Sequence, residues 1–556
     1  MKHYSNEMVR GFLHTEGRRM VNGDGKEVIL RGWGAGNWMN PEGYMMAGAP
    51  IGFGNGDMMS GKLKMPRRFD RGRAIHQVIR DLCGSSYAAA FWPRWYRNYL
   101  GEEDIRCMAE HGYNSIRLPM DAAALLDEEP GIHFNEDTFA MLDDLIDLCE
   151  KYRLYVILDL HGTPGHSGMD CDNGIDNIPR MFLEPETFQR MVTLWTEIAR
   201  RYGDRWIVGG FELLNEPLFP AWTHLESKLA EFYDTVIREI RKFDRNHMFL
   251  LSGPLVGTDT GIFTRSFDPE CENWCYVYHG YHHQPQESSF LKFLDASRRL
   301  NIPAWYGEGR VAVENMPVYY DMLERFHVGY NLFCWKSEGL SGMENGPVTH
   351  LFPEGWEQII GYITEGGPRP GYAESQKLFD GLLECVRFEH CTVKEDMLNG
   401  PMRRPGVTLG AAGYDSAGPG VSFSGGWNEG NELDFRLNDR THLVLREGVK
   451  RPGGMGGGRP MMGGGPRPMQ DLYLELEAGG FACYSLYDVT ADCPVTVTLR
   501  GRGRVRFTCG NLSAETALTE GFAEVVPFSV SPCEKATLRI EVSEGAAELV
   551  SVKFGA

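Results

Sequence analysis

Two glutamates, each at the end of a short apolar run, are the residues best placed to do chemistry. Glu216 ends the run Gly-Gly-Phe-Glu-Leu-Leu-Asn-Glu, and Glu308 ends the run Ile-Pro-Ala-Trp-Tyr-Gly-Glu. A carboxyl at the tip of a buried strand is costly unless it has a chemical task. Two such carboxyls, one protonated and the other ionised ~5 Å away, are what cleavage of a glycosidic bond with retention requires.

The elements that must position these carboxyls alternate between strand and helix from about residue 20 to 385. Eight apolar strands are expected at residues 28–33, 115–118, 155–160, 209–214, 249–252, 275–278, 304–306 and 331–335. Helical periodicity lies between them, for example at residues 103–111 and 137–152. No Gly-x-Gly-x-x-Gly turn opens an early helix, so the repeat favours a (β/α)8 barrel over an open doubly wound sheet.

Barrel geometry brings the two glutamates together. Enzymes of this architecture assemble their sites at the carboxyl ends of the strands. Glu216 follows the fourth expected strand and Glu308 follows the seventh. Their side chains are therefore expected to converge over one mouth.

One connection is much longer than the others. Residues 40–100 follow the first strand and carry four arginines between residues 67 and 73 and an aromatic cluster between residues 91 and 99. In a barrel this loop emerges at the catalytic face, so it is expected to build one wall of the substrate site. A tall wall favours a pocket over an open cleft, and a pocket favours release of terminal sugars or cleavage of a short glycoside.

The composition changes near residue 388. Residues 1–387 are assigned to the barrel, and residues 388–556 read as an antiparallel β-sandwich with strands at 472–476, 495–499 and 536–542. Residues 451–469 are dominated by Gly, Met, Pro and Arg, which is typical of a flexible loop. Because no exposed aromatic strip is evident, a structural role for this domain is favoured over substrate binding.

Charge and composition exclude several classes of partner. The 556 residues carry a formal net charge of -20, which argues against nucleic acid and anionic membranes. No apolar run is long enough to span a membrane, and no signal peptide is visible. The 13 cysteines lack a tight spacing pattern and read as reduced thiols. A cytoplasmic protein is expected as the sequence stands, or a secreted one if a signal was removed; the oligomeric state is left open.

Six motifs in order give the first ~385 residues a specific resemblance. They are Asn-Ser-Ile-Arg117-Leu-Pro, Leu-Asp-Leu-His161-Gly, Asn215-Glu216-Pro217, His279-Gly-Tyr281, Glu308 and Trp335. Together they resemble glycoside hydrolase family 5, the cellulase-like family of retaining (β/α)8-barrel glycosidases. The resemblance implies hydrolysis of β-glycosidic bonds, of the β-glucan or β-glucoside type, by double displacement without a cofactor.

The same resemblance implies a role for each matching residue. Glu216 would be the acid/base and Glu308 the nucleophile, and Asn215 would hydrogen-bond the sugar 2-hydroxyl. The supporting roles implied are as follows: Arg117 and Tyr281 hold Glu308, His161 and His279 contact sugar hydroxyls or the acid/base, Trp335 floors a subsite, and Asn37 and Trp38 add contacts from the first loop.

Several alternatives stay open. Asn215-Glu216-Pro217 is also compatible with the start of a helix. His279, His282 and His283 have no carboxylate at a ligand spacing, so no metal site is expected. Arg310 stands where the family commonly has an aromatic residue, so the substrate could be another sugar, such as a mannoside, a glycolipid, an arabinofuranoside or a galactofuranoside, or carry a charged group. A carbohydrate-binding protein without turnover is the alternative of another class.

Overall fold

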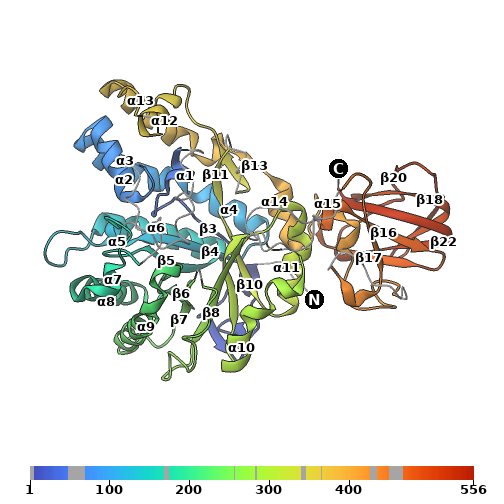
Figure 1. The fold of residues 1–556 in the computed structure, drawn as a ribbon, viewed down its shortest axis with the longest axis horizontal. Helices are drawn as coiled ribbons and strands as arrows, with labels where there is room; N and C mark the ends of the chain where they lie inside the picture. Colours follow the sequence, from blue (N-terminus) through green and yellow to red (C-terminus); the bar gives the residue numbers. More distant parts are fainter. Residues whose placement is uncertain are drawn as a thin grey trace.

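The structure is a computed structural model of the chain, and it describes residues 6–47, 69–167, 174–255, 257–281, 283, 285–339, 346–364, 366–425, 435–449 and 468–555. A barrel with its helices occupies the N-terminal part, and an antiparallel sheet forms the C-terminal part beside it (Figure 1). Among these residues, no helix is long and apolar enough to cross a membrane.

Eight parallel strands close into a barrel in the order β10-β3-β4-β5-β6-β7-β8-β9. They are β3 (Arg31–Gly34), β4 (Ser115–Asp121), β5 (Tyr155–Gly162), β6 (Val208–Glu212), β7 (Met248–Ser252), β8 (Trp274–Tyr281), β9 (Ala304–Arg310) and β10 (Gly329–Phe333). Every residue of β4, β5, β6 and β7 is buried, as expected for parallel strands covered on both faces. All eight predicted strands and the barrel are confirmed.

Helices form the outer layer of the barrel. The longer ones are α4 (Glu102–Glu110), α6 (Glu136–Tyr152), α8 (Pro185–Tyr202), α9 (Glu226–Arg241), α10 (Leu294–Leu300), α11 (Met316–Arg325), α12 (Glu357–Thr364) and α13 (Tyr372–Cys385), and the short ones are α5 (Ala122–Leu125), α7 (Arg180–Leu183), α14 (Glu395–Asn399) and α15 (Pro468–Asp471). Helix α6 begins where the side chain of Asn135 accepts a hydrogen bond from the Thr138 amide, and one face of the helix is buried. Both helices predicted from periodicity, α4 and α6, are confirmed.

The long first connection contains three helices, α1 (Gly43–Ala47), α2 (Gly72–Cys83) and α3 (Ser85–Tyr99). The aromatic cluster of this connection lies on α3 and is buried, with Trp95 stacked between Phe91 and Tyr99. Phe91 of this cluster packs edge-to-face on Phe379 of α13, so this part of the cluster forms core. Residues 48–68 of the expected wall lie outside the described residues.

Small elements complete the barrel side of the chain. A hairpin of β1 (His14–Glu16) and β2 (Arg19–Val21) precedes the barrel, and β11 (Lys336–Glu338), β12 (Val348–His350) and β13 (Thr392–Val393) form a three-stranded sheet after β10. Because β13 pairs with β12, the chain stays on the barrel side past residue 388.

The C-terminal sheet connects nine described strands: β14 (Thr408–Gly410), β15 (His442–Leu445), β16 (Leu472–Glu477), β17 (Phe481–Val489), β18 (Cys493–Cys509), β19 (Leu512–Ala517), β20 (Ala523–Val525), β21 (Ser529–Val530) and β22 (Cys533–Phe554). The long strands β18 and β22 pair antiparallel, with Gly503 opposite Gly545 at their middle. Both glycines have positive φ, where a Cβ would collide with the facing backbone. The prediction of an antiparallel β domain is confirmed, and most of the predicted loop 451–469 lies outside the described residues.

Candidate active site

Glu216 and Glu308 lie together at the mouth of the barrel. Each side chain is buried, and one oxygen of Glu216, one nitrogen of His279 and one oxygen of Glu308 lie within 4.8 Å of one another. The three residues come from the turn after β6, from β8 and from β9. Two carboxylates at this spacing can act on one bond from two sides.

The backbone at Glu216 adopts a rare conformation with positive φ. Glu216 has φ of 31° and Leu218 has φ of 56°, a region that non-glycine residues rarely adopt. No helix begins at this motif, since the next element is the 3-10 turn Pro220–Leu225. The alternative interpretation of Asn215-Glu216-Pro217 as a helix start is therefore wrong.

A glycine after Glu308 allows β8 and β9 to approach closely. Gly309 has φ of 146°, and a Cβ on it would lie 1.9 Å from the Gly280 carbonyl oxygen. The close approach places Tyr281 so that its hydroxyl donates to Glu308 Oε1 at 2.7 Å. Arg310 lies opposite Tyr281 in the β8–β9 register and is half-buried.

Arg117 of β4 contacts three buried carboxylates and one buried amide of the site. Its Nη1 donates to Glu308 Oε2 at 2.6 Å, while Nε and Nη2 donate to the two carboxylate oxygens of Glu212 at 2.6 and 2.9 Å. Its Nη2 also donates to Asn215 Oδ1 at 2.9 Å and lies 3.0 Å from Asp159 Oδ2. One guanidinium thus fixes the orientation of the Glu308 carboxylate and of the Asn215 amide.

Asn215 and Asp159 contact the two nitrogens of His161. Nδ1 of His161 lies 2.9 Å from Asp159 Oδ2, and Nε2 lies 3.1 Å from the amide nitrogen of Asn215, whose Oδ1 accepts from Arg117. Burial lowers the pKa of His161, but the charge of Asp159 and the hydrogen bond with it outweigh burial and raise this pKa to about 9. His161 is held between Asp159 and Asn215 and acts on the site through the amide.

His279 of β8 contacts the Glu216 carboxyl. Its Nδ1 lies 2.7 Å from Glu216 Oε1, and its Nε2 lies 3.8 Å from Glu212 Oε1. Burial lowers the pKa of His279, but the charge of Glu308 and hydrogen bonds with Glu212 and Glu216 outweigh it and raise this pKa to about 10. A charged His279 donates its Nδ1 proton to Glu216.

Glu308 is held ionised. Burial alone would raise the pKa of its carboxyl, but the charges of His279 and Arg117 bring this pKa below its ordinary value. The hydrogen bond from Tyr281 acts in the same direction. A buried, ionised carboxylate is the form that can attack an electrophilic carbon.

Glu216, His279 and Glu308 also satisfy the spacing of a metal site. No carboxylate lies at a ligand spacing from His279 along the chain, but the fold brings two next to it, from the turn after β6 and from β9. A metal needs a neutral imidazole, whereas the raised pKa of His279 keeps it charged, and Arg117 already holds Glu308. The charge of these residues therefore opposes a cation.

The structure contradicts the expectation that Trp335 floors the substrate site. Trp335 is fully buried, its indole nitrogen donates to Asp104 of α4 at 2.8 Å, and its ring packs edge-to-face on Trp33. Phe333, the last residue of β10, lies at the mouth instead, against Gly34 and Gly36.

Asn37 and Trp38 are engaged within their own loop. Asn37 Oδ1 accepts from the Glu42 amide at 3.0 Å, and the Trp38 indole donates to the Tyr96 carbonyl at 3.0 Å. Both side chains are buried. These contacts stabilise the loop, whereas the amide nitrogen of Asn37 has no hydrogen-bond partner among the described residues. The expected sugar contacts of Asn37 and Trp38 stay a prediction.

Sequence reasoning missed two carboxylates of the site, Glu212 and Asp159. Each lies at an inward-facing position of a barrel strand, and both bind Arg117. A signal was present, because Asp159 precedes His161 by two residues in a strand whose side chains alternate between faces. A charged residue inside an otherwise apolar strand marks such a position.

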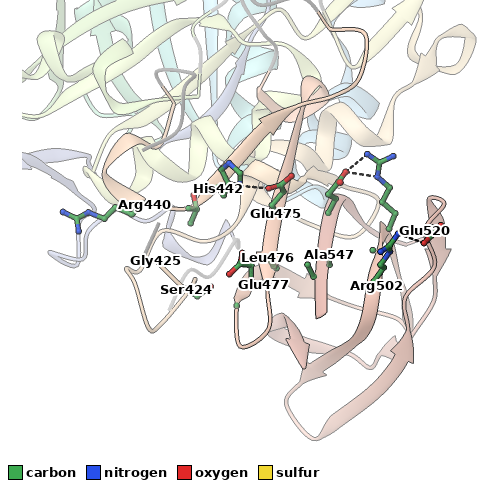
Figure 2. Close-up of a pocket in the computed structure, with 16 residues that line it drawn as sticks. Ser424, Gly425, Arg440, His442, Glu475, Leu476, Glu477, Arg502, Glu520 and Ala547 are labelled. Carbon is green, nitrogen blue, oxygen red and sulfur yellow. Dashed lines mark hydrogen bonds and ion pairs between the residues drawn. The ribbon is translucent and has the colours of Figure 1, made fainter. Parts of the chain in front are cut away.

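A separate groove of about 690 Å³ crosses the C-terminal sheet. Its floor contains Gly501, Ala546 and Ala547, and Figure 2 shows His442 paired with Glu475 and Arg502 paired with Glu520 along its sides. The carboxylates named here already form ion pairs, so we assign no chemistry to this groove.

The comparisons with known proteins concern the barrel. Residues 77–338 match the family model described as cellulase (glycosyl hydrolase family 5). The chain is 30% identical over 271 residues to a beta-xylosidase of Phanerodontia chrysosporium, covering 49% of this chain and 52% of the relative.

Two further relatives match shorter segments. Endoglucanase C of Acetivibrio thermocellus is 26% identical over 234 residues, which is 41% of this chain and 65% of the relative. A probable glucan 1,3-beta-glucosidase A of Emericella nidulans is 30% identical over 189 residues, which is 33% of this chain and 44% of the relative. The chain thus matches between about two fifths and two thirds of these relatives' own lengths.

Proposed function

We propose that this chain, whose residues 77–338 match the model of glycosyl hydrolase family 5, is a retaining β-glycoside hydrolase acting on a carbohydrate substrate. The observation that carries the proposal is the approach of a Glu216 oxygen and a Glu308 oxygen within 4.8 Å. Retaining enzymes place their two carboxyls ~5 Å apart, while inverting enzymes leave ~6.5–9.5 Å for a water.

In the first step Glu308 attacks the anomeric carbon. A bond forms between a Glu308 carboxylate oxygen and that carbon, and the bond to the leaving oxygen breaks as Glu216 gives this oxygen its proton. Hydrogen bonds from Arg117 and Tyr281 orient the ionised Glu308 before attack. His279 contacts Oε1 of Glu216, which leaves Oε2 as the oxygen that would transfer the proton in this step.

In the second step water releases the sugar. Glu216, now a carboxylate, takes a proton from water as the water oxygen bonds to the anomeric carbon, and the bond to Glu308 breaks with its electron pair returning to the carboxylate. Both glutamates recover their starting protonation states. Asn215, held by Arg117 and His161, is placed to hydrogen-bond a sugar hydroxyl in both steps.

The range of substrates is proposed at the level of β-glycosides. The relatives are named for xylosides, for glucans cleaved internally and for 1,3-β-glucans. The expectation of terminal release rested on the first loop, whose residues 48–68 lie outside the described residues. The length of the products is therefore not part of the proposal and has to be measured.

The test uses a panel of aryl β-glycosides of glucose, xylose, mannose, galactose and arabinofuranose. We expect wild-type protein to release the aryl alcohol from at least one of them, and Glu308→Gln to lose this turnover. Glu197→Gln, which changes a half-buried carboxylate on the outer helix α8 that pairs with Arg201, is the matched control and should keep full activity.

A 2-fluoro glycoside of the same sugar identifies the nucleophile. It should label wild-type protein on the peptide that carries Glu308, because the fluorine slows release of the covalent intermediate. A label on another residue would overturn the assignment of Glu308. Well-folded wild-type protein that binds oligosaccharides but neither turns over the panel nor takes up the label would be a carbohydrate-binding protein.

A further inference from the structure

A cavity of about 580 Å³ lies on the barrel domain beside the mouth. Helices α2 and α3 form one side of it, and the segment after β4, up to the start of α6, forms the other. Its volume is in the range of small-molecule sites, roughly 300–1,000 Å³. The proposed mechanism uses none of its lining residues.

Polar groups line this cavity without a protein partner. The His76 ring stacks on Trp92, with centroids 3.9 Å apart and an interplanar angle of 11°, and its nitrogens make no hydrogen bond to the residues that the structure describes. The hydroxyl of Tyr96, a buried residue, likewise has no partner within the described part of the chain, and the exposed guanidinium of Arg80 lies at the edge of the same cavity. Buried and half-buried polar groups of this kind are normally satisfied, by water or by a ligand where protein is absent.

Asp121, which lines the cavity, and Asn40 both lie close to Gly162 at the end of β5. Asp121 ends β4 and lines the cavity, and a Cβ on Gly162 of β5 would lie 2.7 Å from Asp121 Oδ1 and 3.0 Å from Asn40 Oδ1. Gly162 directly follows His161, which holds Asn215 in the site. Asn40 is 1% exposed, and neither end of its amide has a hydrogen-bond partner among the described residues.

The charges around the cavity select the class of ligand. Four carboxylates and two guanidiniums line it, from Asp121, Asp127, Glu128, Glu129, Arg73 and Arg80. Arg73 pairs with Glu128, so the walls disfavour an anion. Burial, with the charges of Arg80 and Arg73, lowers the pKa of His76 to about 3, so its ring is neutral and offers one donor and one acceptor. A neutral ligand rich in hydroxyls matches these groups.

We propose that this cavity is a second sugar-binding site, which holds units of a β-glycan that are not themselves cleaved. The proposal rests on the proposed function, because it takes the ligand to be the uncleaved part of the same substrate. His76, Tyr96 and Arg80 bind hydroxyls of these units, and Asn40 and Asp121 lie between them and the site of cleavage.

The test compares a short and a long substrate of the same sugar. The variants are His76→Phe, which keeps a ring on Trp92, and Tyr96→Phe, which removes only the hydroxyl. The substrates are the aryl glycoside that wild-type protein cleaves and the matching hexasaccharide, for example cellohexaose for a glucoside. Each variant should raise KM for the hexasaccharide about three- to tenfold, as expected for one lost hydrogen bond, and leave aryl glycoside turnover unchanged.

Arg97→Ala is the matched control, because Arg97 is exposed on α3 and its contact is with the Pro93 carbonyl of its own helix. It should change neither substrate. Unchanged KM for the hexasaccharide in both variants would overturn the proposal, and so would an equal change for both substrates, which would mean a distorted catalytic site. If His76→Phe does not fold, Arg80→Ala, at an exposed position, takes its place.

A binding measurement separates this proposal from the proposed function. Glu308→Gln is titrated with the hexasaccharide by calorimetry, with and without His76→Phe. Weaker binding in the double variant supports the second site even if wild-type protein cleaves nothing, a result that would refute only the hydrolase. Equal affinity in both proteins would refute the second site even if hydrolysis is intact.

Discussion

Arg117 and Glu212 form a bidentate ion pair inside the barrel, with Nε–Oε2 and Nη2–Oε1 distances of 2.6 and 2.9 Å. Both side chains are inaccessible to solvent. The pair fixes the plane of the guanidinium, so that the remaining nitrogen, Nη1, points at Glu308. Glu212 therefore acts through Arg117 on Glu308, the proposed nucleophile, and we treat it as a positioning residue.

Glu212→Gln tests this role. The amide presents a donor to one Arg117 nitrogen where the carboxylate presents an acceptor, so one of the two hydrogen bonds is lost and the guanidinium turns. We expect kcat to fall by up to about 100-fold with KM little changed, since small misplacements of catalytic groups cost this much. Steady-state kinetics measures it.

A control variant separates an effect of Glu212→Gln on kcat from an effect on stability alone. Glu197→Gln breaks an ion pair of similar type on the surface, where such pairs contribute ~0–1 kcal/mol, and should leave kcat unchanged. If Glu212→Gln lowered only the melting temperature, with kcat at the wild-type level, Glu212 would be structural and the positioning role would be wrong.

The barrel and the meeting of Glu216 with Glu308 could be predicted because they depend on local patterns. Buried parallel strands are short apolar runs, and the carboxyl ends of barrel strands share one face, so two glutamates about 90 residues apart become neighbours. The partners of Arg117 could not be predicted in the same way. Which inward-facing carboxylates reach one guanidinium depends on strand register, and the β5–β6 and β8–β9 pairs both contain irregularities.

Helix α3 of the first connection could not be predicted for a related reason. Its aromatic residues Phe91, Trp95 and Tyr99 repeat every four positions, which fits one face of a helix, but Pro93 within the run argues against a helix. Packing against Phe379, far along the chain, stabilises α3. Contacts between segments so distant in sequence leave no local pattern.

Arg117→Lys should move the acidic limb of the pH profile. Lysine keeps the charge but cannot donate to Glu212, Asn215 and Glu308 at once, so the pKa of Glu308 rises toward its ordinary value. Glu308 must be ionised to attack, and activity is lost as the pH falls through its pKa. The limb of kcat/KM therefore shifts to higher pH in the variant, and an unshifted limb would refute the electrostatic role of Arg117.

His279 makes stability depend on pH in a defined direction. Its pKa is about 10 in the folded protein and ~6.5 when unfolded, so the folded state binds the proton more tightly. This contribution is fully present below pH ~6.5 and is lost as the pH rises through about 10. The difference in urea midpoint between wild type and His279→Gln should be largest near pH 6 and shrink toward pH 10. A constant difference would mean that His279 is not charged in the fold.

Hydrolysis should be independent of metal. Although Glu216, His279 and Glu308 have the spacing of a metal site, the charged imidazole and Arg117 oppose a cation there. Dialysis against EDTA should leave kcat unchanged for the aryl glycoside that wild-type protein cleaves. Activity that disappears on chelation and returns with a divalent metal would instead make this cluster a metal centre.

Phe333, the last residue of β10, lies at the mouth, whereas Trp335, two residues later, packs against other elements. The strand ends at Phe333, so the alternation of its side chains no longer governs Trp335, which turns toward Asp104 of α4. Trp335→Phe loses the indole hydrogen bond and should lower the free energy of unfolding by about 1–3 kcal/mol, because a buried acceptor loses a donor, with KM unchanged. Phe333→Ala removes a ring beside Gly34 and Gly36 at the mouth and should raise KM severalfold. If instead Trp335→Phe raised KM and Phe333→Ala did not, Trp335 would be the aromatic residue that contacts the sugar.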